Sequence, residues 1–200
     1  MKIIDLSHRL SERNPVFPGD NPIKLTKYRN MAEHGYVSHE LQGGFHIGTH
    51  IDMPMHMIED SRTCADFAPE CFIGRGIVID MRNNTLPCLD NVREGDIVLL
   101  HTGHSSKYGS ADYYTSYPAI SEDLAKAFVS KKIKIPGMDS PSPDYAPFNI
   151  HKILLSEGIF LIENMTNLAA LENIGEFKVF ALPLNIEAEA SYVRPIAIIN

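Results

Sequence analysis

Short apolar runs, rich in β-branched residues, recur along the chain and predict β-strands. Turn-forming residues separate the runs, which are too short to be helices with a buried face. The predicted strands are residues 3–6, 76–81, 97–100, 133–135, 159–162, 179–184 and 196–199. Strands therefore make up most of the predicted regular structure.

Helical periodicity is less frequent. Residues 121–132 begin with Ser121, a suitable N-cap, followed by an acidic first turn. Residues 147–157 have a proline at their start and Gly158 just beyond their end, and residues 167–173 form a shorter helical pattern. The mixture predicts an α/β fold with a mixed β-sheet core and a few flanking helices. A chain of 200 residues suits one domain, residues 1–200.

Charge restricts the class of partner. The net charge is −7, and the longest basic run is Lys131-Lys132, which disfavours binding to nucleic acid or to an anionic membrane surface. The first residues also lack an apolar run long enough for a signal peptide or a membrane span. We therefore expect a cytoplasmic protein whose partner is a small molecule.

Histidines are concentrated in one segment. Three of the nine lie within residues 46–56, and His46, His50, Asp52 and His56 are separated by even offsets. An extended backbone would direct all four side chains to one face, whereas the glycines and the proline of this stretch oppose a helix. Residues four apart on a straight strand lie about 13 Å from each other, near the limit for two imidazoles on one ion. The segment is therefore expected to bend, and Gly48 is the natural place.

The donor set predicts a metal site. Imidazole nitrogens and a carboxylate suit a borderline divalent ion such as Zn²⁺, Mn²⁺ or Fe²⁺. Because the segment contains no cysteine, an open catalytic site is favoured over a closed structural zinc site. The alternative is that these histidines are surface residues or hydrogen-bonded core residues. Their high density and the even offsets between them disfavour this alternative.

Residues 46–56 read His-x-Gly-Thr-His-x-Asp-x-Pro-x-His. This motif resembles the signature of the cyclase-like metal-dependent hydrolases, the family that includes bacterial kynurenine formamidase and isatin hydrolase. Further segments follow in the family's order, namely residues 5–7, 17–20, 99–103, 137–140, 183–184 and 193–194. The resemblance implies a swivelling β/β/α-like fold and a homodimer or homotetramer.

The resemblance also implies ligands for one or two divalent ions per chain, most plausibly zinc or manganese. It assigns His46, His50 and Asp52 to a first ion. Asp52 would bridge to a second ion, which His151 and Glu163 would complete. His151 falls on the predicted helix of residues 147–157, and Glu163 follows the apolar run that ends at residue 162.

The activity implied by the family is cleavage of a C–N amide bond in a small aryl formamide or cyclic amide by metal-activated water. His56 would be the catalytic proton shuttle between that water and the leaving nitrogen. Phe17 would contact the substrate where formamidases carry a tryptophan, a residue that this chain lacks.

Other features leave alternatives open. Residues 187–194 lack the glycines and the proline of the relatives, which predicts a different substrate rim, and Arg194 could pair with a substrate carboxylate or with another side chain. Two His and one carboxylate also serve mononuclear metal oxygenases. A non-catalytic metal-binding relative is a third possibility. The additional donors, His151 and Glu163, favour hydrolysis.

Overall fold

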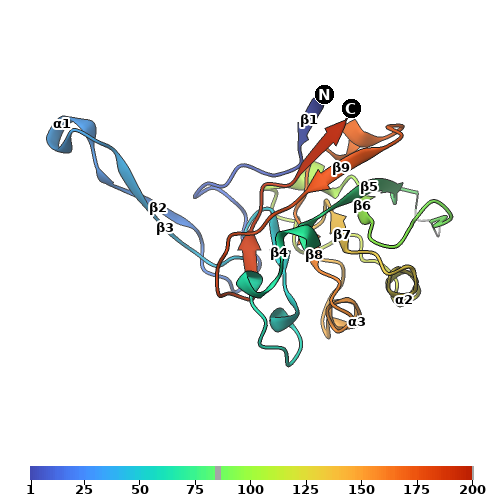
Figure 1. Cartoon of the computed structure of the whole chain (residues 1–200). Helices are drawn as coiled ribbons and strands as arrows, with labels where there is room; N and C mark the ends of the chain where they lie inside the picture. Colours follow the sequence, from blue (N-terminus) through green and yellow to red (C-terminus); the bar gives the residue numbers. More distant parts are fainter. Residues whose placement is uncertain (84–86, 200) are drawn as a thin grey trace.

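A computed structural model describes residues 1–83 and 87–199, and its main feature is a large mixed β-sheet (Figure 1). The sheet has nine strands in the order β1-β11-β9-β5-β6-β7-β8-β4-β10. The pairs β5–β6, β6–β7 and β7–β8 are parallel, and the other pairs are antiparallel. Its strands are β1 (Lys2–Asp5), β4 (His50–Asp52), β5 (Ile73–Asp80), β6 (Ile97–His101), β7 (Ile135–Met138), β8 (Leu161–Glu163), β9 (Phe177–Phe180), β10 (Ala190–Tyr192) and β11 (Ile196–Ile199). The predicted α/β class is confirmed.

Two hydrophobic cores lie on opposite faces of the sheet. In β6, Ile97 and Leu99 belong to one core, whereas Val98 and Leu100 belong to the other. This alternation follows from the two-residue period of a strand, and burial of both faces explains why the strand reads as a continuous apolar run. The second core is covered by α2 (Glu122–Lys131) and α3 (Asn149–Leu155), which pack against each other (Figure 1).

Helix ends follow the capping rules in α2 but not in the last predicted helix. Ser121 accepts a hydrogen bond from the backbone N–H of Leu124, as expected for an N-cap. Residues 167–173 form only the 3₁₀ turn η5 (Leu168–Leu171), so the predicted helix is wrong there. Asn167 and Asn173 adopt left-handed conformations that limit this turn at both ends. The other 3₁₀ turns are η1 (Pro54–His56), η2 (Cys64–Asp66), η3 (Pro69–Phe72) and η4 (His104–Lys107).

Two predicted strands are displaced along the chain. The run predicted at residues 133–135 becomes β7 at Ile135–Met138, and the run at 179–184 becomes β9 at Phe177–Phe180. Pro136 and Gly137 hide β7 from a pattern search because both residue types usually interrupt strands. A side chain at Gly137 would come within 2.6 Å of Met165 Sδ, so the glycine permits close packing.

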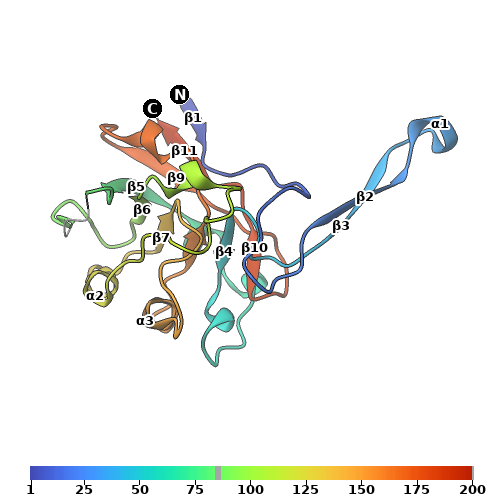
Figure 2. The same cartoon turned by 180° about the vertical axis from the view of Figure 1, so that it is seen from behind.

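A hairpin arm, residues 24–42, projects from the body of the molecule (Figures 1 and 2). It consists of β2 (Lys24–Arg29), the single-turn helix α1 (Met31–His34) and β3 (Ser38–Gln42), and its two strands form a separate antiparallel sheet. The sequence pattern did not predict it, because its strands carry polar residues on both faces. Within the described residues, no helix is long and apolar enough for a membrane crossing.

Candidate metal centre and active site

The centre of the site is a pair of neighbouring strands. His50 on β4 is the register partner of Glu163 on β8, and Asp52 lies two residues further along β4 on the same face. All three side chains are buried. The Nε2 atom of His50 lies 3.4 Å from Asp52 Oδ1 and 3.4 Å from Glu163 Oε2. Strand pairing thus brings two carboxylates to one imidazole.

A bend before β4 adds His46 to this group. Gly48 has φ of +66°, a left-handed conformation that L side chains rarely adopt, and it lies where the sequence predicts the bend. The turn directs the Nδ1 atom of His46 to 3.1 Å from Asp52 Oδ1. His46 and His50 therefore approach the same carboxylate from two sides.

Two further histidines come from different elements. His56 ends the 3₁₀ turn η1, and its ring centroid lies 4.1 Å from that of His46 and 5.8 Å from that of His151. His151 is buried on α3, with Nε2 3.3 Å from Glu163 Oε1 and 3.9 Å from Asp52 Oδ2. The structure thus gathers the other four predicted ligands and His56 around Asp52.

The geometry distinguishes two sets of close ligand atoms. His46, Asp52 and His56 form one set, and His50, Asp52 and Glu163 form the other, each with ligand atoms within 4.8 Å of one another. His56 therefore lies at ligand distance from the carboxylate, although the sequence hypothesis gave it a proton-transfer role. The two roles differ in their effect on metal content, which a His56 variant measures directly.

The buried polar atoms of the cluster indicate whether its residues fit a metal ion. Among the described residues, His50 Nε2, both carboxylate oxygens of Asp52 and Glu163 Oε1 have no hydrogen-bond partner. Leaving one such atom buried without a partner costs about 1–3 kcal/mol. These four atoms belong to one cluster of nitrogen and oxygen donors without cysteine, which is the chemistry that suits a divalent ion at an open site. The residues fit the metal.

Charge in the cluster shifts its pKa values in consistent directions. Burial would raise the pKa of Asp52, but His50 and His46 outweigh it and hold that pKa well below its usual range. Burial would lower the pKa of His46, but Asp52 and Glu189 raise it to about 10. Burial lowers the pKa of His56, although Asp52 opposes this. Asp52 is therefore ionised and attracts positive charge, whereas burial favours the neutral form of His56.

A cavity of about 180 Å³ adjoins the cluster. His46, His56, His151 and Glu163 form its polar wall. The remaining lining residues include three aromatic side chains, Phe17, Tyr114 and Phe148, with Phe17 against Tyr114 in an edge-on contact of 5.5 Å between centroids. The same cavity is thus lined by the polar side chains of the cluster and by aromatic rings, and Phe17 is one of these rings.

The chain resembles known proteins over most of its length. A family model described as putative cyclase matches residues 4–145. The chain belongs to this cyclase family. It is 28% identical over 210 residues to kynurenine formamidase of Bacillus cereus, with 96% of this chain and 95% of that protein covered. It is 33% identical over 207 residues to an uncharacterized protein of Methanocaldococcus jannaschii, with both chains fully covered.

Solved structures share the cyclase-family fold. Isatin hydrolase A from Labrenzia aggregata, bound to benzyl benzoate, superposes with a TM-score of 0.86 at 21% identity, covering 99% of this chain and 93% of that one. A potential metal-dependent hydrolase with cyclase activity gives a TM-score of 0.78 at 23% identity, covering 98% and 96%. The chain therefore has the same overall fold as these two proteins.

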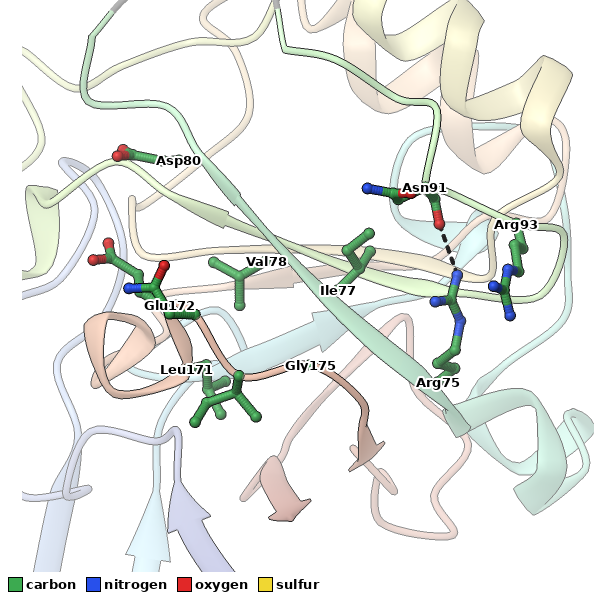
Figure 3. A pocket seen from close by; sticks show the side chains of 11 residues that line it. Arg75, Ile77, Val78, Asp80, Asn91, Arg93, Leu171, Glu172 and Gly175 are labelled. Atoms are coloured by element: carbon green, nitrogen blue, oxygen red, sulfur yellow. Dashed lines mark hydrogen bonds between the residues drawn. The ribbon is translucent and has the colours of Figure 1, made fainter. Parts of the chain in front are cut away.

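A second cavity, of about 460 Å³, lies beside β5 and is shown in Figure 3. At its edge Asp80 and Glu172 approach the buried His101. Arg82 already lies between these carboxylates, with Nη2 2.7 Å from Asp80 Oδ2 and 2.8 Å from Glu172 Oε1. The guanidinium already occupies the space between the two carboxylates and offsets part of their charge, so we interpret this group as an ion-pair network.

Sequence reasoning missed two carboxylates beside the cyclase-family cluster. Asp144 contacts His151, and Glu189 contacts His46. Glu189 lies in residues 187–194, whose departure from the relatives was the available signal, whereas Asp144 had none beyond its place in a proline-rich turn. Arg194 pairs with Asp5, its Nη2 lying 2.7 Å from Asp5 Oδ2, which supports the structural alternative for that residue.

Proposed function

We propose that the protein is a metal-dependent hydrolase that cleaves the C–N amide bond of a small aryl formamide or cyclic amide. The observation that carries this proposal is the cluster of buried donor atoms without hydrogen-bond partners that adjoins a cavity with aromatic walls. The similarity to kynurenine formamidase supports amide hydrolysis as the reaction.

By the family resemblance, His46, His50 and Asp52 would hold one divalent ion, zinc or manganese, and Asp52, His151 and Glu163 would hold a second. The closest ligand atoms of the structure group differently, with His56 beside His46 and Asp52, and His50 beside Asp52 and Glu163. Such an ion lowers the pKa of bound water to about 7 and polarises a carbonyl oxygen. The buried carboxylates of Asp52 and Glu163 compensate part of the positive charge.

His56 is the residue that moves the proton. Its ring lies at the cavity wall between those of His46 and His151, and burial keeps its pKa below the ordinary value. A neutral imidazole at pH 7 accepts a proton from the attacking water and returns it to the departing nitrogen.

The cavity determines the size and kind of substrate. At about 180 Å³ it lies below the range of roughly 300–1,000 Å³ that accommodates drug-sized ligands. Phe17, Tyr114 and Phe148 offer ring faces and edges to one aromatic group. A single-ring aryl amide therefore fits better than a peptide or a long-chain amide.

The test is an assay of the zinc- or manganese-loaded protein with formanilide, N-formylkynurenine, isatin and phenyl acetate. Hydrolysis of at least one amide at a rate above that of the apoprotein is expected, with release of formate from the formamides. Metal-loaded protein that leaves every amide intact contradicts the proposal and favours a non-catalytic metal-binding relative. Oxygen uptake with Fe²⁺ would instead indicate an oxygenase.

A further inference from the structure

We propose that Asp144 and Glu189 are positioning residues that each orient a different histidine of the cluster and thereby control a different metal ion. This inference rests on the metal-binding function proposed above. A histidine that binds metal through one ring nitrogen commonly donates the N–H of the other to a carboxylate or carbonyl, which fixes its tautomer and orientation.

The three histidines proposed as ligands, His46, His50 and His151, have such outer partners. His50 places Nδ1 2.8 Å from the carbonyl oxygen of Gly48, which can only accept, so Nδ1 carries the proton and Nε2 faces the cluster. His151 places Nδ1 2.7 Å from Asp144 Oδ1. His46 is turned the other way, with Nδ1 toward Asp52 and Nε2 3.5 Å from Glu189 Oε1.

Asp144 is held rigidly. It is 6% exposed, and its Oδ2 atom accepts a hydrogen bond of 2.6 Å from the backbone N–H of Ile150 at the start of α3. One oxygen of Asp144 thus contacts the start of the helix and the other contacts the His151 ring. The Asp144 carboxylate therefore directs His151 Nε2 toward Asp52 and Glu163.

Glu189 provides a looser support. Its side chain is 41% exposed and its contact with His46 is longer, although its backbone carbonyl accepts a hydrogen bond from Met53 N–H beside β4. Because Asp144 contacts only the His151 side and Glu189 only the His46 side, removal of one carboxylate affects one ion. Loss of such an outer partner typically weakens metal binding 10- to 100-fold.

The test is a zinc affinity measurement by chelator competition, without substrate, on wild type, Asp144→Asn and Glu189→Gln. Asparagine retains an acceptor for the Ile150 N–H, so α3 stays capped, and apoprotein unfolding temperatures verify that the variants fold. Glu187→Gln is the matched control, since Glu187 is exposed and lies two residues from Glu189. We expect each variant to weaken a different one of two binding steps by about 10- to 100-fold, with the control unchanged.

Unchanged affinity in either variant, or equal weakening of both steps by both variants, overturns this assignment. The affinity readout is independent of turnover. A wild type that binds two ions but hydrolyses no amide would contradict the proposed reaction and leave the positioning roles intact.

Discussion

His50 and Glu163 lie opposite each other on β4 and β8, with His50 Nε2 3.4 Å from Glu163 Oε2. The pairing of two strands distant in the sequence therefore sets the geometry of the cluster. Because the proposed ligands His50, Asp52 and Glu163 belong to the sheet itself, metal binding is expected to stabilise the fold.

Removal of metal should lower thermal stability. The buried carboxylates of Asp52 and Glu163 then lose the cation that satisfies their oxygens, and a ligand at 100 times its Kd stabilises the folded state by about 2.7 kcal/mol. Thermal unfolding with chelator and with added zinc measures the shift. Asp52→Asn should unfold at the same temperature in both conditions, and a wild type that also shows no difference contradicts the coupling.

His56→Ala should reduce kcat by about 10²- to 10⁴-fold, the usual contribution of general acid–base catalysis, with near-normal metal content. The reason is that His56, which lines the cavity and whose pKa burial lowers, is the proposed proton carrier. Steady-state kinetics on the metal-loaded variant, with elemental analysis of the same sample, measures both. Metal loss in step with activity would make His56 a ligand, in line with its closeness to His46 and Asp52.

Phe17→Ala should raise KM more than it lowers kcat, because the ring lines the cavity where the aromatic group of the proposed substrate would lie, away from the reacting atoms. An aromatic pair contributes about 0.5–1.5 kcal/mol, which corresponds to a change of up to about 10-fold. Phe45→Ala is the comparison, since Phe45 contacts Tyr192 and does not line the cavity. Equal kinetics for the two variants would remove Phe17 from the substrate contact.

Gly76→Ala should destabilise the fold by about 1–3 kcal/mol, as overpacked cores do. A Cβ atom at Gly76 would lie 2.0 Å from Phe177 Cε2 and 2.7 Å from Val179 Cγ2, so β5 and β9 would have to separate. Gly175→Ala serves as the control because no atom lies within 4 Å of its added Cβ. Urea unfolding of both variants measures the difference, and equal midpoints would argue against this close packing.

The sequence predicted the strands that carry continuous apolar runs, such as β6. A strand that is buried on both faces has apolar residues at successive positions, and this run is visible in the sequence. It predicted α2 from its cap and acidic first turn. The arm strands escaped prediction because neither face packs against the body, so no apolar alternation marks them. Strand β7 escaped in part because Pro136 and Gly137 resemble turn residues.

The site was predictable to a similar extent. His46, His50 and Asp52 are close in sequence, and both their even spacing and the glycine that bends the chain lie within the same segment. This part of the site could therefore be predicted. The approach of His151 and Glu163 depends on long-range pairing, so only the family resemblance suggested it. Glu189 contacts a histidine from a distant part of the chain, and Asp144 contacts His151 across the turn that precedes α3, so neither contact follows from a regular local pattern.

The measurement that tests the central claim most directly is metal content per chain, by elemental mass spectrometry, on wild type and His50→Ala purified without a metal-binding tag. The account predicts near-stoichiometric zinc or manganese in the wild type, with up to two ions per chain after reconstitution, and a large loss in His50→Ala. A wild type that retains no tightly bound divalent metal even after reconstitution would contradict the account.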